Sequence, residues 1–484
     1  MSYVGSNGGS FGGLSRALTA LHAQQRGLDV TGQNIANVNT VGYSRQRAEL
    51  QSIGGSVVPA IFAKSPIVGQ GVSADQVTRI RDAFLESRAQ NEGATAARLT
   101  EQSASLTEIE SAFREPGSTG VQALLSKVWQ AFGNVSNHPE NIGARTALLE
   151  SAKTLVGGLQ TTRSSLDRQW GETRANLQTL VADANTMAGQ VADLNKAILA
   201  ATNAGMESNE LADKRDVLVQ ELAASVGATS SRADDGSLTI SVGGSVLVSK
   251  SSAFRLAVDG ATSPDTVTAA TAPRVLIVPG GSAVPLGGRA AAQVDALGPA
   301  AAQGTSILTF RGQLDTFAQD LATTVNTVHS AGYDLDGTSG NVLFASSGGP
   351  LTAGSISLGI TDPRGVAAAK YAPAGVPLKA SNDGHIADAL TKLGQLPSGP
   401  DATYRSLIVS LGVQSSVAAS NVTIQNVIVG QVDSARESVA GVNLDEEMTN
   451  MLQYQHAYSA AGRLVTAIDE MLDTVINRMG LVGR

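Results

Sequence analysis

The sequence predicts a mainly α-helical, multidomain chain that runs out and back, with a helix at each end and strands in between. Three observations favour this architecture. Apolar residues repeat every seven positions near both ends, long helical patterns fill most of the chain, and strand signals concentrate in its middle. A narrow apolar stripe needs a partner helix, so we expect the two ends to pair as a coiled coil. Both termini would then lie at one end of a rod, with a β-rich domain at the other.

The N-terminal helix is expected to follow a segment rich in Gly, Ser and Asn, residues 1–13, which we expect to be disordered in the free protein. Its predicted seam, the row of apolar residues facing a partner helix, consists of Leu14, Leu21, Leu28 and Ile35. Turn-forming residues at 37–42 end the helix. Residues 43–77 then predict extended segments and a hairpin.

Further helical patterns occupy 80–114, 121–132, 143–202, 211–226, 307–329 and 404 to the C-terminus. The run from 143 to 202 contains no proline and is too long to bury its own apolar stripe, so it must lie along other helices. The strand signals are a turn at 234–236 between alternating runs and the apolar runs 275–278 and 356–360.

The C-terminal helix has the most regular pattern. Its predicted seam consists of Leu444, Met451, Tyr454, Tyr458, Val465, Ile468, Leu472, Val475 and Met479. Glu447 interrupts the seam at its start. Asn443 is expected to cap the helix, with Glu446 completing a capping box.

These elements predict three domains. A terminal coiled-coil domain takes 1–60 and 437–484, an α-helical rod domain takes 61–230, 305–333 and 401–436, and a β-rich outer domain takes 231–304 and 334–400.

The composition argues against several functions. The net charge is −8 without a basic cluster, which argues against nucleic acid and anionic membranes as partners. No cysteine is present, so disulfides, thiolate metal sites and thiol nucleophiles are excluded. We expect neither a secretory signal peptide nor a transmembrane helix.

No pattern predicts catalysis, a metal site or a cofactor. None of the five histidines has metal-ligand spacing. Residues 334–337 begin like a calcium loop, but Ala345 stands where the bidentate glutamate belongs. We therefore predict a structural protein and not an enzyme.

Two segments carry a family resemblance. Residues 34–46 resemble the N-terminal signature of flagellar rod, hook and hook-associated proteins, with Asn34, Asn37, Asn39, Gly42 and Tyr43 as the matching residues. The segment 441–448 and the helix after it are similar to the C-terminus of the hook-associated protein 1 family. Internal blocks at 211–222, 308–312 and 329–334 also fit that family.

The resemblance implies a structural subunit at the junction between flagellar hook and filament, required for filament assembly. It also implies secretion by the flagellar export apparatus to the extracellular flagellum, with terminal helices that pair only on assembly, as in flagellin and hook proteins. The implied partners are further copies in a ring, the hook protein, a second junction protein (hook-associated protein 3) and a cytoplasmic export chaperone on the C-terminal helix.

Two alternatives stay open from the sequence. Another axial flagellar protein, of the hook or distal-rod type, would share the signature at 34–46 but, by resemblance, lack the long helices between 143 and 226. A cytoplasmic coiled-coil adaptor would have ordered terminal helices when free.

Overall fold

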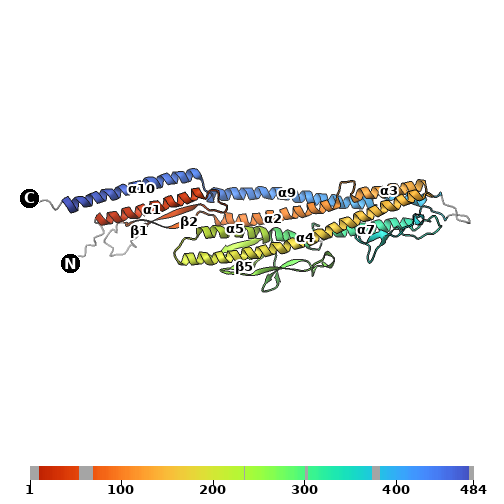
Figure 1. Ribbon diagram of the computed structural model, residues 1–484, viewed down its shortest axis with the longest axis horizontal. Helices are drawn as coiled ribbons and strands as arrows, with labels where there is room; N and C mark the ends of the chain where they lie inside the picture. Colours follow the sequence, from red (N-terminus) through yellow and green to blue (C-terminus); the bar gives the residue numbers. More distant parts are fainter. Residues whose placement is uncertain (1–9, 54–68, 234, 300–303, 373–381, 479–484) are drawn as a thin grey trace, which may run out of the picture.

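The computed structural model describes residues 10–53, 69–233, 235–299, 304–372 and 382–478. It is an elongated rod in which the first and last helices lie at the same end (Figure 1). The prediction of a mainly helical, multidomain chain with small sheets is confirmed. Residues 1–9 of the segment expected to be disordered lie outside the described residues, and residues 10–13 already belong to the first helix.

The terminal end of the rod contains two helices and a hairpin. Helix α1 (Ser10–Ala36) lies along α10 (Leu444–Asp473), which continues into a π-helical turn at Thr474–Arg478. Strands β1 (Gln46–Ile53) and β2 (Gly71–Arg79) form the predicted antiparallel hairpin. The hairpin packs on α1 through a small apolar cluster of Val30, Ala48 and Val77, separate from the main core.

The rest of the rod is a helical bundle, and its helices are α2 (Ala83–Phe113), α3 (Val121–Asn137), α4 (Ile142–Asn203), α5 (Asn209–Val226), α7 (Ile307–His329) and α9 (Pro400–Ala440). The observed bounds of α4 and α7 agree closely with the predicted ranges. Asn141 caps α4 by accepting a hydrogen bond from the Ala144 amide, and Ser306 caps α7 in the same way at Thr309. The main apolar core runs through this bundle.

In the described part of the chain, the remaining strands form three further antiparallel sheets. One contains β3 (Ala228–Arg232), β4 (Leu238–Val242), β5 (Ser245–Ser249) and β6 (Ser252–Ala253). The second contains β7 (Arg255–Asp259), β8 (Arg274–Val278) and β9 (Ser282–Ala283), and the third β10 (Phe344–Ser346) and β11 (Ile356–Leu358). Two short helices, α6 (Gly288–Leu297) and α8 (His385–Lys392), interrupt the region that the sequence predicted to be rich in strands.

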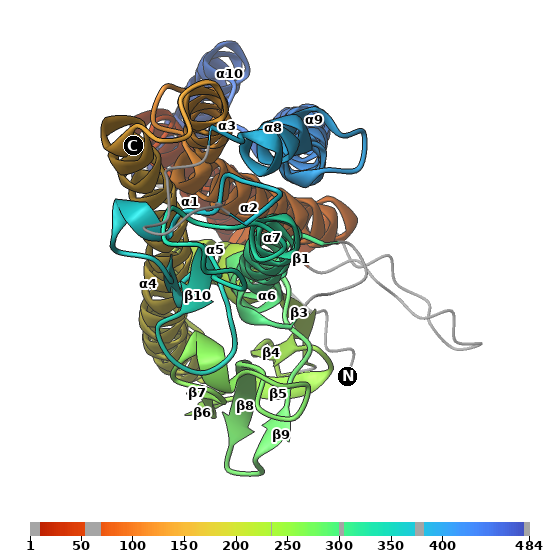
Figure 2. The ribbon, with the colours of Figure 1, turned by 90° about the vertical axis from the view of Figure 1, so that its right-hand side faces the viewer.

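The sheets of β3–β9 differ in position from the expectation, whereas β10 and β11 lie toward the end opposite the termini (Figures 1 and 2). The strands β3–β9 flank the side of the rod next to α4 and do not form the end opposite the termini (Figures 1 and 2). Asn195 holds the first sheet there: its amide donates to the Leu238 and Lys250 carbonyls at 2.8 Å and accepts from the Leu238 amide at 3.0 Å. Asn185 pairs with Leu256 of β7 in the same manner. The apolar pattern of α4 predicts that one face of this helix is covered by other elements. It does not predict which elements cover that face.

A second difference concerns α9. The helical region 385–476 contains one stretch that is long and apolar enough, by length and composition alone, to cross a membrane, with a mean hydropathy of 1.4. The sequence predicted no transmembrane helix, since it contains no continuous apolar run of 18 residues. In α9 the apolar residues alternate with Ser, Thr, Asn and Gln rather than with charges.

Replacing Trp170 tests how much the packing of the main core contributes to stability. Trp170 is fully buried in α4, and its indole N–H donates to the Leu297 carbonyl at 3.0 Å. We expect Trp170→Ala to lower the free energy of unfolding by about 3–5 kcal/mol, because it leaves a large cavity and an unpaired carbonyl. Urea unfolding of the purified chain measures this. Met206→Ala, at a residue 63% exposed, is the control and should stay within about 0.5 kcal/mol of the original chain.

Candidate functional site: the joint between the terminal helices and the rod

Small residues let α1 and α10 approach closely. A Cβ added at Gly27 would come within 2.6 Å of the Tyr454 ring, and one at Gly13 would lie 3.3 Å from the end of the Ile468 side chain. Ala17 and Ala23 are almost completely buried in α1. The predicted seam of this helix contains large apolar residues only, whereas its closest contacts with α10 are made by glycines.

The structure places the predicted seam residues unevenly. All four residues of the α1 seam are half-buried: Leu14, Leu21, Leu28 and Ile35. In α10, Ile468 is buried, Met451, Tyr454, Val465 and Leu472 are half-buried, and Leu444, Tyr458 and Val475 are exposed. Met479 lies outside the described residues. Part of each seam therefore remains uncovered within one chain.

Asn34 connects four segments at the base of the terminal helices. Its amide group donates to the Gln46 carbonyl at 2.9 Å and to the Glu447 carboxylate at 3.0 Å. Its carbonyl oxygen accepts from the Gln46 amide at 3.0 Å and from the Tyr43 hydroxyl at 2.8 Å. Asn34 is 1% exposed, so these bonds satisfy both amide donors and the oxygen in the protein interior.

Glu447 explains the interruption of the C-terminal seam. The carboxylate is 2% exposed and accepts from Asn34 and from Arg45 Nε, the latter at 2.7 Å. Asn443 caps α10 as predicted, through the amides of Asp445 and Glu446. The Glu446 carboxylate binds Arg45 Nη1 at 2.7 Å. The ion pairs raise the pKa of Arg45 although burial opposes the shift.

The loop after α1 carries the remaining signature residues. Gly42 has φ +80°, and an added Cβ would overlap the Val217 side chain of α5, so the position requires glycine. Burial, together with Asp213, Glu447 and Glu210, raises the pKa of Tyr43 to about 12, which keeps its hydroxyl protonated as the donor to Asn34. Asn37 shapes the turn by donating to the Gln33 carbonyl and accepting from Thr40, whereas Asn39 is exposed.

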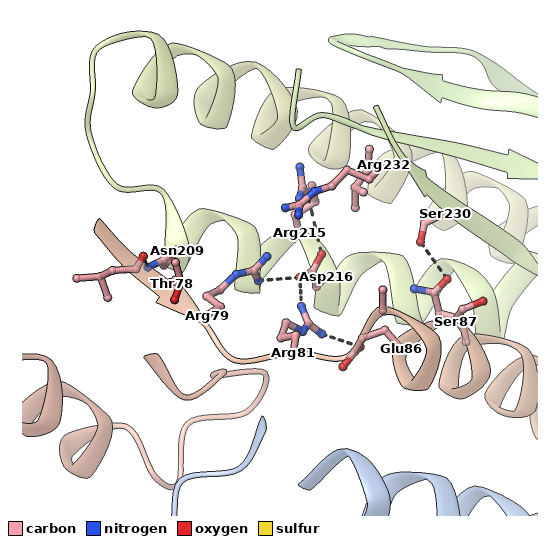
Figure 3. Close-up of a pocket in the computed structure, with 14 residues that line it drawn as sticks. Thr78, Arg79, Arg81, Glu86, Ser87, Asn209, Arg215, Asp216, Ser230 and Arg232 are labelled. Atoms are coloured by element: carbon pink, nitrogen blue, oxygen red, sulfur yellow. Dashed lines mark hydrogen bonds and ion pairs between the residues drawn. The ribbon is translucent and has the colours of Figure 1, made fainter. Parts of the chain in front are cut away.

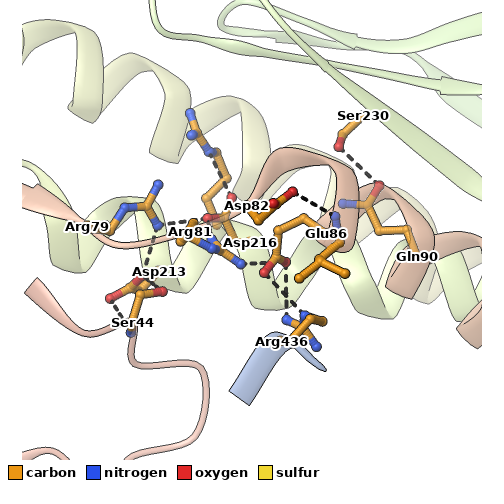
Figure 4. A network of polar contacts seen from close by, with 12 residues as sticks. Ser44, Arg79, Arg81, Asp82, Glu86, Gln90, Asp213, Asp216, Ser230 and Arg436 are labelled. Carbon is orange, nitrogen blue, oxygen red and sulfur yellow. Dashed lines mark hydrogen bonds and ion pairs between the residues drawn. The ribbon is translucent and has the colours of Figure 1, made fainter. Parts of the chain in front are cut away.

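A network of ion pairs continues from this loop into the rod (Figure 4). Ser44 donates to Asp213 through its amide and its hydroxyl. Arg79, at the end of β2, donates to Asp213 and Asp216 of α5, both at 2.8 Å. Arg81 then pairs with Asp216 and Glu86, and Arg436 of α9 closes the network on Glu86. We call this network, together with Asn34, Arg45, Glu446 and Glu447, the joint.

A polar pocket of about 560 Å³ lies beside the network (Figure 3). Arg79, Arg81, Arg215 and Arg232 line it together with Glu86 and Asp216. Arg215 is 1% exposed, and its burial, together with the neighbouring arginines, lowers its pKa to about 10. Its Nη1 donates to Asn195, so it braces α5 against α4.

The chemistry of the joint is that of fixed charges. The lining of the pocket contains no cysteine, histidine or lysine to serve as a nucleophile or a neutral-pH base. Within the described ranges, no group of three or more His, Asp or Glu residues is arranged to hold a metal ion. The arrangement can hold four segments in one orientation, which is a structural task.

Comparison with known families identifies the middle and both ends of the chain. Residues 106–344 match the flagellar hook-associated protein FlgK helical domain. Residues 14–43 match the flagella basal body rod protein family, and 434–479 match the C-terminal domain of the basal body rod proteins FlgEFG. The two rod-type matches cover most of α1 and all of α10, the helices that meet at the joint.

Relatives that match the chain over its whole length show whether it is a rod protein or a hook-associated protein. Flagellar hook-associated protein 1 of Bacillus subtilis (strain 168) is 30% identical over 98% of this chain and 99% of its own length. The chain belongs to the flagellar hook-associated protein 1 family. The member of this family from Salmonella typhimurium is 24% identical over 96% of this chain and 99% of its own length. By contrast, flagellar basal-body rod protein FlgG of Caulobacter vibrioides matches only 14% of this chain.

A solved structure supports the fold. The flagellar hook junction protein FlgK from Burkholderia pseudomallei superposes with a TM-score of 0.60, covering 74% of this chain and all of that one at 15% identity. As a hook-associated protein 1, the chain is a structural component of the bacterial flagellum, at the junction of hook and filament.

Asp213 tests the network in the rod. Asp213→Ala removes a partner from Arg79 and from Ser44. The side chain of Arg79 is only 11% exposed, so water cannot replace the lost carboxylate well. We expect the free energy of unfolding to fall by about 3–5 kcal/mol, because a buried charge is left poorly compensated. Urea unfolding of the purified chain measures this. Asp295→Ala removes the exposed pair with Arg98 and should cost at most about 1 kcal/mol. Equal losses in the two variants would contradict a special role for the network.

Asn34 tests the connection between the first and last helices. Asn34→Ala removes one hydrogen-bond partner from the Glu447 carboxylate and one from the Gln46 backbone. Each buried group left without a partner lowers the stability of the folded chain by about 1–3 kcal/mol. We expect this variant to dissociate from isolated hooks at a lower temperature than the original chain. Sedimentation of the hooks and blotting of the supernatant measure the release. Asn39→Ala is the matched control, since Asn39 is exposed in the same loop. Identical release of both variants would show that Asn34 does not hold the helices together.

Proposed function

We propose that copies of this chain form a ring on the distal end of the hook and that their terminal helices fold together there as a coiled coil. The hydrogen bond between Asn34 and Glu447 carries this proposal, because it joins the two ends of the chain across 413 positions. Close packing at Gly27 and the cap at Asn443 complete the paired unit. The function is structural, without catalysis or a cofactor, and filament assembly requires it.

Uncovered apolar surface on the terminal helices supports contacts between copies. Leu444, Met448, Leu452, Tyr458, Leu464, Met471 and Val475 of α10 are all 42–58% exposed. The first four of these lie on one side of the helix and the last three on the opposite side, and exposed apolar surface of this extent in a free protein marks a contact site or an aggregation hazard. We infer that the half-buried seams of α1 and α10 complete their packing against the terminal helices of neighbouring copies.

The same surface supports the remaining partners. The hook protein and the second junction protein, hook-associated protein 3, would meet the ring from its two sides. A cytoplasmic chaperone would cover α10 before export, and the chain would leave through the flagellar export apparatus unfolded. An unfolded passage accords with the absence of disulfides in the sequence, which contains no cysteine.

We propose that the chain has the three domains predicted from its sequence, with one change. The terminal domain of 1–60 and 437–484 is extended to include β2, because β2 pairs with β1 and packs on α1. The rod domain then begins near Ile80, with 305–333 and 401–436 as its later segments. In the outer domain, the described part of 231–304 lies beside the middle of the rod and that of 334–400 toward the end opposite the termini (Figure 1).

Deleting the gene tests the proposed function. We expect cells with hooks but without filaments, which release flagellin into the medium, and full rescue by the original gene. Absence of hooks in the deleted strain would favour a rod or hook component, and normal filaments would exclude a junction role. Electron microscopy and blotting of the medium measure the outcome.

Rescue with a seam variant tests the helix pairing. Leu472→Asp places a charge on the half-buried face of α10 and should weaken the pairing by at least about 2 kcal/mol. We expect this variant to keep a folded rod, by circular dichroism, and to fail in rescue. Ser459→Asp, at an exposed position of the same helix, should rescue. Rescue by both variants would show that the seam is not an assembly surface.

A further inference from the structure

The surface of α9 lacks charge over a long stretch. Between Ser406 and Val432 the sequence contains no Asp, Glu, Lys or Arg, although most of these residues are exposed or half-buried. Exposed faces of helices in soluble proteins ordinarily carry charged side chains. Depletion of charge on an exposed face is typical of the centre of a protein–protein interface.

Large apolar residues line up on the outer side of this helix. Val409, Val413, Val417, Ile424 and Val427 are each 53–60% exposed, and we call them the α9 ridge. Their spacing of four, four, seven and three residues places them in one stripe. The opposite side of α9 is buried against α2 through residues such as Ala418 and Val432. The ridge therefore faces away from the bundle.

A groove of matching character lies on another side of the same rod. It has a volume of about 500 Å³, and α2 lines it with the small residues Thr100, Ser103, Ala104, Thr107 and Ser111 and with one charged residue, Glu108. Val422 contributes from α9. Val422 and Val413 are nine residues apart, which is half a turn around the helix at 3.6 residues per turn. Ridge and groove thus face different directions, and one copy cannot fill its own groove.

We propose that the α9 ridge of one copy packs into the α2–α9 groove of the next copy. This inference rests on the proposed function, in which copies form a ring. A row of β-branched side chains fits between small residues in the manner of helix ridges in grooves. Since the two surfaces are different, the contact is head-to-tail, and such a contact can be repeated from copy to copy around the ring of the proposed function.

The area of the ridge argues for a contact made only inside the assembly. From 409 to 427 the helix is about 27 Å long and about 10 Å wide, so the strip covers on the order of 270 Å² per partner. A stable pair of free proteins buries about 800 Å² per partner. The ridge alone cannot hold two free copies together. It suffices for copies whose terminal helices already hold them at a high effective concentration.

The charges around α9 disfavour a membrane as the occupant. Helices that lie on a membrane carry Lys and Arg along their polar face. In α9 the residues at the two ends of the charge-free stretch include Asp401, Arg405 and Asp433, and the polar Gln425 is buried, donating to Glu92 of α2. A second copy of the chain accounts for an apolar, uncharged face better than a lipid surface does.

Cysteine cross-linking tests the contact, since the natural chain contains no cysteine. The variant carrying Val417→Cys and Ala104→Cys places one thiol on the ridge and one in the groove. Hooks are isolated from cells that express it and treated with a short bismaleimide. We expect a ladder of dimers, trimers and larger multimers of the chain on a denaturing gel. The purified free chain at micromolar concentration should give no ladder.

The matched control is the pair Ala419→Cys and Ala104→Cys. Ala419 is also exposed but lies about 200° around the helix from Val417, so we expect at least tenfold less multimer. Equal ladders from both variants would overturn the proposal. So would dimers from Val417→Cys alone, which indicate a ridge-to-ridge contact, or cross-links to the hook protein instead of to a second copy.

Two further outcomes separate this inference from the proposed function. If the unmodified chain is found on hooks and the Val417→Cys/Ala104→Cys variant is present there without a ladder, the ridge contact is wrong and the junction role stands. If the unmodified chain is absent from hooks, both the ridge contact and the proposed junction function are wrong. Co-sedimentation of the purified chain with phosphatidylglycerol vesicles, lost in Val417→Glu, would assign the ridge to a membrane and overturn the proposal.

Discussion

The buried bond between Asn34 and Glu447 fixes how the two ends of the chain meet. A carboxylate that is 2% exposed is costly unless it is paired, and here Asn34 and Arg45 both donate to it. An apolar seam that repeats every seven residues allows neighbouring helices to slip by a whole repeat at little cost. A single buried polar contact removes that freedom, because only one register satisfies it. One asparagine and one glutamate therefore fix the register in which α1 and α10 pair.

The joint extends this constraint to the rod. Arg45 binds the start of α10 with its side chain and the end of α9 with its amide, which donates to the Ala440 carbonyl at 3.0 Å. Arg79 and Ser44 bind α5 through Asp213. The connections between the terminal helices and the bundle are thus polar and directional, whereas the cores on either side are apolar. Such connections define an orientation more strictly than apolar packing does.

The sequence predicted those features that depend on local patterns. Helix α7 was predicted at its observed bounds, and Asn443 was identified as the cap of α10, because periodicity and capping act within a few residues. The features that it missed depend on distant contacts. Glu447 was taken as a break in an apolar seam, since its partners are Asn34 and Arg45 at the other end of the chain. The position of the sheets beside α4 depends on Asn185 and Asn195, two helix residues with no local signature.

The burial of the joint has a consequence for the environments in which it works. Salt screens exposed charges strongly but reaches buried pairs much less. The side chains of Arg79 and Asp213 are 11% and 9% exposed, whereas those of the surface pair Arg98 and Asp295 are about half exposed. Of the pairs in the joint, those around Asp213 therefore depend much less on ionic strength than the Arg45–Glu446 pair, whose carboxylate side chain is 57% exposed, so a change of salinity acts mainly where α10 begins and little where β2 meets α5.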